Sequence, residues 1–74
     1  MEKFSVLLLY PDYYAASFGQ ETYYAFVEAE SPDRAIALAQ QQCFNGRTEA
    51  IDNLEDLYPL LVTKGYNLDV QRGN

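Results

Sequence analysis

The sequence predicts an α+β fold, in which a small mixed or antiparallel sheet of three to four strands, in the order 2-1-3-4, carries one main helix on one face. Three observations support this fold. Two segments rich in β-branched and aromatic residues come first, a segment with a strong helix start follows, and shorter strand-like segments come last, in ββαβ(β) order. The 74 residues have room for one hydrophobic core, so we expect a single domain over residues 1–74.

The first predicted strand covers residues 4–10 and is apolar on both of its faces, which is typical of the central strand of a sheet. Residues 11–21 contain Pro, Gly and three aromatic rings, and we expect them to form a long loop. The second predicted strand, residues 22–30, alternates along its length, so that Tyr24 and Phe26 lie on the same side of the sheet.

A helix is predicted to start at Ser31, because a serine hydroxyl can cap a free backbone N–H and because Pro32 suits the first helical position. Small and apolar residues then recur at helical spacing and define the buried face of this helix: Ala35, Ile36, Ala39 and Cys43. We expect Cys43 to be a packed, unreactive thiol. The helix is expected to end at Gly46, which suits a left-handed cap.

The pattern after this helix is less regular. Residues 49–58 are compatible with either a short helix or a partly irregular segment. Residues 60–63 are predicted to form the third strand, and residues 66–70 a short edge strand after a turn. A strand–helix–strand crossover places its two strands parallel, so the second and third strands should both run antiparallel to a central first strand.

One helix covers only one face of a sheet, so the opposite face needs another cover. Tyr24 and Phe26 are expected on this far face. The first strand adds one of two alternating sets: Leu7 and Leu9, or Phe4, Val6 and Leu8. Two alternatives remain for the cover: either residues 47–58 fold over this face, or a partner does, as in a C2 homodimer.

Composition and charge exclude several functions. The chain has no histidine and one cysteine, and it lacks a glycine-rich phosphate loop and a nucleophile motif, so we expect no enzyme, metal site or cofactor. Its net charge is −6, so we expect no direct binding to nucleic acid. The longest apolar run is too short to cross a membrane and no signal peptide is recognisable, so we expect a cytoplasmic protein that does not bind membranes.

Two groups of residues are candidates for binding another protein. The densest group of carboxylates in the chain consists of Glu49, Asp52, Glu55 and Asp56. It predicts either a solvated acidic segment or a docking patch for a basic partner surface. The aromatic candidates are Tyr13, Tyr14, Tyr24 and Phe26. These rings either enlarge a small core or contact a partner.

The segment Glu28-Ala29-Glu30-Ser31 leads into a helix with alanines at 35 and 39 that ends in Cys43-Phe44-Asn45-Gly46. This arrangement resembles part of a small phage-encoded anti-CRISPR protein of the type I-F kind, and the chain as a whole resembles small proteins of phages and bacteria. The resemblance implies an inhibitor that acts by binding a protein. The anti-CRISPR protein is basic and this chain is acidic, so its contact residues do not transfer.

The expected function is therefore that of a non-enzymatic acidic protein-binding module. In its specific form, the module is a phage-type inhibitor that occupies a basic, nucleic-acid-binding surface of its partner. The alternative is an accessory or regulatory subunit of a bacterial protein complex that binds through its apolar sheet face.

Overall fold

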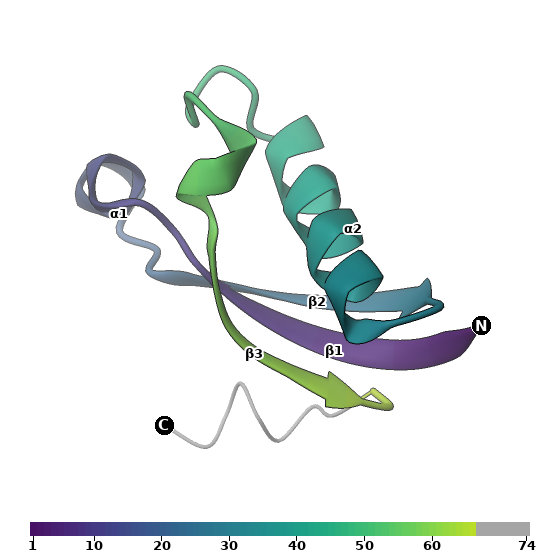
Figure 1. Cartoon of the computed structure of the whole chain (residues 1–74). Coiled ribbons are helices and arrows are strands. Elements are labelled where there is room, and N and C mark those ends of the chain that lie inside the picture. The colour runs from purple at the N-terminus through teal and green to yellow at the C-terminus, as the bar shows by residue number, and fades with distance from the viewer. Residues whose placement is uncertain (67–74) are drawn as a thin grey trace.

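A computed structural model of the chain describes residues 1–66, and its arrangement is a three-stranded sheet with two helices (Figure 1). The elements follow in the order β1 (Glu2–Leu9), α1 (Asp12–Phe18), β2 (Thr22–Ala29), α2 (Pro32–Asn45), a short 3₁₀ helix (Leu54–Asp56) and β3 (Tyr58–Lys64). The α+β class is confirmed, whereas the predicted ββαβ(β) order is wrong, because a helix lies between the first two strands.

The strands lie in the order β2-β1-β3, and β1 pairs antiparallel with both neighbours. The predicted central place of the first strand and the predicted directions are thus confirmed. β3 is longer than the predicted residues 60–63. It includes Pro59, which an edge strand tolerates, and the register of its pairing with β1 shifts beside this proline, between Leu7 and Leu8 of β1. The predicted fourth strand, residues 66–70, lies outside the described residues except for Tyr66, which belongs to no strand.

The prediction of a loop over residues 11–21 is wrong, because this connection contains the short helix α1. Pro11 occupies the N-cap position, and Gly19 ends the helix in the left-handed conformation with φ 72° while its N–H binds the carbonyl of Ala15. The Pro and Gly that suggest a loop instead bracket seven helical residues.

The start of α2 is as predicted, whereas its end is not. The hydroxyl of Ser31 accepts a hydrogen bond of 3.3 Å from the backbone N–H of Arg34, and Pro32 is the first helical residue. Gly46 follows the helix with φ −86° and ψ −3°, which is right-handed, so the predicted left-handed cap is wrong. The chain continues from Gly46 in a turn, where the N–H of Arg47 binds the carbonyl of Phe44.

Removing the Ser31 cap is expected to destabilise the protein measurably. The substitution Ser31→Ala removes the acceptor for the Arg34 N–H and should lower the free energy of unfolding by about 1 kcal/mol. Urea denaturation followed by circular dichroism measures the change. Ser31→Asp keeps an acceptor at the cap and should stay within a few tenths of a kcal/mol of the parent protein. Equal losses in both variants would contradict a capping role.

The core lies between the sheet and α2, as the layers in Figure 1 show. The α2 face predicted from helical spacing is confirmed, since Ala35, Ala39 and Cys43 are fully buried. The sheet contributes its inner face, namely Phe4, Val6, Leu8, Ala25, Val27 and Ala29. Close packing against alanines lets the helix approach the sheet, so a small chain still encloses a close-packed core.

The segment between α2 and β3 completes this same core. Ile51 and Leu57 are buried at 1% and 0% exposure and belong to the core cluster beside α2. The alternative in which residues 47–58 cover the far face of the sheet is therefore wrong. The segment is partly irregular and lies on the α2 side (Figure 1), because its apolar residues find their burial there.

Candidate functional site

The acidic segment, defined by Glu49, Asp52, Glu55 and Asp56, is held against α1 by one side chain. The Tyr13 hydroxyl donates a hydrogen bond of 2.5 Å to the carboxylate Oδ2 of Asp56 and accepts one of 2.9 Å from the backbone N–H of Asp52. Tyr13 comes from α1, 39 and 43 positions earlier in the chain. Two groups predicted separately from the sequence thus form one surface.

Most of the acidic segment faces solvent. Glu49, Asp52 and Glu55 are exposed, and Asp56 is half-buried beside the Tyr13 ring. The hydrogen bond to Asp56 raises the pKa of the Tyr13 hydroxyl, so this tyrosine stays protonated and remains a donor to the carboxylate at neutral pH. The carboxylates are therefore presented on an ordered surface that α1 supports.

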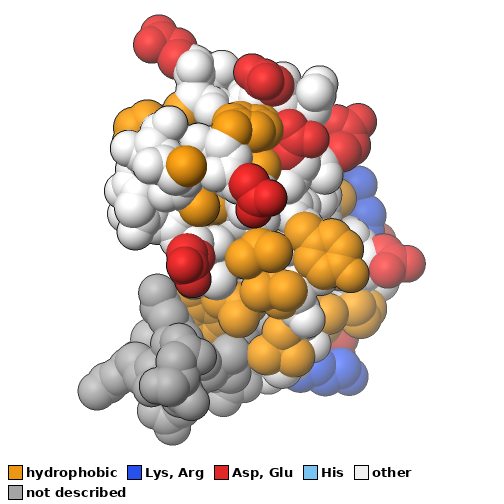
Figure 2. Space-filling model, turned by 90° about the vertical axis from the view of Figure 1, so that its left-hand side faces the viewer, with side chains coloured by type: hydrophobic (Ala, Val, Ile, Leu, Met, Phe, Trp, Pro, Cys, Tyr) orange, Lys and Arg blue, Asp and Glu red, His pale blue; other side chains and the backbone are white. Residues whose placement is uncertain are grey.

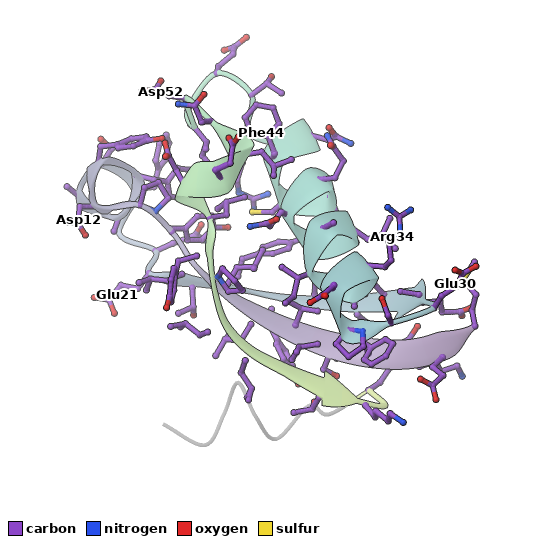
Figure 3. The ribbon with its side chains drawn as sticks, in the orientation of Figure 1. Asp12, Glu21, Glu30, Arg34, Phe44 and Asp52 are labelled. Atoms are coloured by element: carbon purple, nitrogen blue, oxygen red, sulfur yellow. The ribbon has the colours of Figure 1, made fainter. Side chains whose placement is uncertain are left out.

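Charge is unevenly distributed over the molecule. Figure 3 places Asp12 and Asp52 at the end of the molecule that holds α1, and Glu30 and Arg34 at the opposite end. Among the described residues, the one cation near the acidic segment is Arg47, which is half-buried. The acidic segment therefore has no exposed cation beside it within residues 1–66, and its field reaches the solvent.

Next to the acidic segment lies a stack of aromatic rings from α1 and from Tyr10, the residue that follows β1. Tyr10 and Tyr14 stack at 4.2 Å between ring centroids, and Tyr14 and Phe18 at 4.5 Å. The spacing of four residues places Tyr14 and Phe18 one above the other along α1, and Tyr10, which lies just before the helix, extends the stack. Tyr14 is buried and belongs to the core, which is the first of the two alternatives left open for these rings, whereas Tyr13 and Phe18 are exposed.

Arg47 fastens this aromatic stack to the end of α2. Its Nε donates to the Tyr14 hydroxyl at 3.1 Å, and a terminal nitrogen donates to the carbonyl of Cys43 at 3.3 Å. Its guanidinium lies 5.6 Å from the ring centre of Tyr10 and 5.0 Å from that of Tyr23, which are cation–π distances. No carboxylate pairs with Arg47 among the described residues.

The sequence does not predict the role of Arg47. Burial alone would lower the pKa of its guanidinium, but contacts with Tyr14, Tyr10 and Cys43 raise the pKa overall, so it remains a cation. One signal in the sequence was available: Arg47 is the only cation between Arg34 and Lys64 and follows the end of a helix, where a cation can bind the last carbonyls.

Cys43 is fully buried in the core, which confirms the prediction of a packed thiol. Burial raises its pKa, although a hydrogen bond with Tyr10 acts in the opposite direction. Burial also raises the pKa of the Tyr10 hydroxyl well above its usual range. Both groups are therefore neutral at physiological pH and contribute packing to the core.

A shallow groove runs between α1 and residues 46–50, with Tyr13, Phe18 and Arg47 on its walls. Within the described residues, every buried side-chain nitrogen and oxygen has a hydrogen-bond partner. In the same part of the chain, no group of three or more Cys, Asp or Glu side chains is arranged to hold a metal ion. The groove thus offers a surface but no buried polar group that awaits a ligand.

The second candidate surface is the face of the sheet opposite α2, here called the open face. Alternation and strand pairing place these side chains on it: Leu7, Leu9, Tyr24, Phe26, Tyr58 and Leu61. Of the two sets in the first strand, the structure thus selects Leu7 and Leu9 for this side. Several members are strongly exposed, and Figure 2 shows touching hydrophobic side chains over the lower part of the molecule, below scattered acidic ones.

One end of the open face is covered by Gly65 and Tyr66, which follow β3. The Ser5 hydroxyl donates a hydrogen bond of 2.6 Å to the carbonyl of Gly65, and the ring of Tyr66 packs at 4.8 Å from that of Phe26. Lys3 lies over the Tyr66 ring at 5.4 Å. Ser5 is buried as a result, while the end of the face that carries Leu9 and Tyr58 stays exposed.

Comparison with protein-family models, with curated proteins and with solved structures finds no match for this chain. The class of this protein therefore rests on its fold and its surfaces alone: it is a small α+β domain with an acidic end and an apolar sheet face. No helix within residues 1–66 combines the length and the apolar character that crossing a bilayer requires.

Proposed function

We propose that this chain is a non-enzymatic, acidic protein-binding module that uses the acidic segment to occupy a basic, nucleic-acid-binding surface of another protein. In this role it acts as an inhibitor in the manner of the phage-encoded anti-CRISPR protein that residues 28–46 resemble. The observation that carries the proposal is the bridge made by Tyr13, which orders the acidic segment without neutralising it.

Structural order in the acidic segment matters because binding through surface charges is weak when the charged side chains and their loop must first be immobilised. A carboxylate on a mobile loop loses conformational entropy on binding, whereas one on a supported surface loses less. The net charge of −6 adds long-range attraction to a basic partner, which raises the association rate and decreases as salt screens it. Such a surface competes with a phosphate backbone for the same arginines and lysines.

Reversing two exposed charges of the acidic segment should weaken binding by about tenfold or more. The variant Glu49→Lys with Glu55→Lys is chosen because both side chains are exposed and neither bonds to Tyr13, so the fold should be retained. A pull-down from a bacterial lysate at several salt concentrations, with mass spectrometry of the captured protein, identifies the partner. Titration of the purified partner then measures the affinity.

The matched control changes net charge equally at the opposite end of the molecule, with Glu2→Lys and Glu30→Lys. Glu2 forms an exposed ion pair with Lys64, which contributes little stability, so this control should also fold. It should bind almost as well as the parent protein. The proposal fails if both variants bind alike, if affinity is independent of salt, or if nucleic acid does not compete for the partner.

A second candidate function follows from the exposure of the open face. An accessory or regulatory subunit would bind its complex through this apolar face, and charge reversal would then leave binding unchanged. Under this function Tyr24→Ala or Phe26→Ala abolishes binding. The two candidate functions therefore give opposite results in the same titration.

A further inference from the structure

The open face has the composition of an interface centre. Leu9, Phe26 and Leu61 are 38%, 37% and 41% exposed, and each comes from a different strand. Leu7 pairs with both Leu61 and Tyr24, so apolar side chains continue across the three strands. Tyr58 adds a ring that is 62% exposed at the end of β3. Large apolar side chains that are exposed to solvent on one face favour association with another apolar surface.

The charges around this face suit a second copy of the same chain. Among the described residues this face carries one cation, Lys3, and one anion, Glu28. The two residues are opposite each other in the register of β1 and β2. The face is therefore close to neutral although the chain carries −6. Two copies repel less when they meet here than through the acidic segment, because Asp52 lies on the side of the sheet away from the open face (Figure 3).

The area of the open face limits the expected strength of association between two copies. Strands of seven and eight residues are about 26 Å long, and three of them make a surface about 15 Å wide. Because Gly65 and Tyr66 already cover one end of the face, two such faces bury at most on the order of 800 Å² in total, which is below the usual range of stable interfaces. An area this small favours at most a reversible association, and we expect a dissociation constant of about 10–100 µM.

We propose that the open face joins two copies of this chain into a weak C2 dimer and leaves an acidic segment free on each outer side. In Figure 1 the connection that carries Asp52 and the helix α2 lie on the side of the sheet away from the open face. The dimer is bivalent for a basic surface, so a partner with two such surfaces within reach gains avidity. The dimer surface and the acidic segment are separate, so either proposal can fail alone.

The test is sedimentation velocity of the full chain between about 2 and about 500 µM. The parent protein should shift from monomer to dimer across this range, and about 0.5 M salt should not dissociate the dimer. Leu61→Glu should weaken association by about tenfold or more. The matched control Leu38→Glu changes a leucine of nearly equal exposure (38%) on α2 and should leave association unchanged. Leu9→Glu repeats the test from β1.

Circular dichroism at low concentration establishes that each variant is folded, so that loss of the dimer is not loss of the fold. A chain that stays monomeric throughout the concentration range would overturn the dimer, as would a dimer that Leu38→Glu weakens as much as Leu61→Glu does. Binding of a different protein to the open face of a monomeric chain would also overturn it. Loss of partner binding by the acidic segment, with the dimer intact, would refute the proposed function alone.

Discussion

Replacing Leu8 with alanine is expected to lower the free energy of unfolding by about 2–5 kcal/mol, whereas the same change at Leu9 should cost less than about 1 kcal/mol. The two leucines are neighbours on the central strand and differ in the face they occupy. Leu8 is fully buried between the sheet and α2, while Leu9 is 38% exposed on the open face. Both changes lose the same β-propensity, so their difference isolates burial.

The loss at Leu8 is large for so small a domain. A chain of 74 residues is expected to have a total free energy of unfolding of about 4–11 kcal/mol, so Leu8→Ala is expected to remove roughly half of it. Thermal unfolding should shift down by roughly 10–30 °C. Urea denaturation at about 2 µM, where most of the chain is expected to be monomeric, measures both variants. Equal destabilisation by the two changes would contradict the assignment of β1 faces.

Replacing Arg47 with alanine is the second change with a large expected effect, a loss of about 1–3 kcal/mol. The substitution removes donors to the Tyr14 hydroxyl and to the carbonyl of Cys43, together with the cation that lies over two tyrosine rings. Because those contacts join α1 to α2, we expect α1 to loosen. The near-ultraviolet circular dichroism of the tyrosines should fall along with stability.

Arg34 provides the matched control for this prediction. It is exposed on α2, so Arg34→Ala should change stability by no more than about 0.5 kcal/mol. Arg47→Lys keeps the charge but not the planar guanidinium, and it should lie between the parent and Arg47→Ala. If Arg47→Ala and Arg34→Ala behave alike, the aromatic stack does not depend on this cation.

Part of the candidate site could be predicted from the sequence. Composition alone singles out the carboxylates at 49–56 and the tyrosines after the first strand, because both stand out from their surroundings. Their contact could not be predicted, since the Tyr13 hydroxyl meets Asp56 across 43 positions of chain. Long-range contacts depend on how elements pack, and one sequence carries no direct record of them. Arg47 was missed for the same reason: its partners come from α1, β2, α2 and the residue that follows β1.

Some features follow from local chemistry and needed only the sequence. The Ser31-Pro32 helix start and the buried face of α2 arise from capping and from spacing within one element, and the central place of β1 follows from its apolar character on both faces. The short helix α1 was misjudged because Pro11 and Gly19 bound a helix as readily as they mark a loop, and seven residues give too little periodicity to decide.

Other features were decided only by tertiary structure. The sequence left residues 47–58 free to cover either side of the sheet, since Ile51 and Leu57 are apolar in any arrangement. In the fold they complete the core beside α2, because apolar surface is buried most effectively where the alanine face of the helix already excludes water. That choice leaves Leu9, Phe26 and Leu61 facing outward and creates the open face, a property of the packed chain that no single segment of the sequence contains.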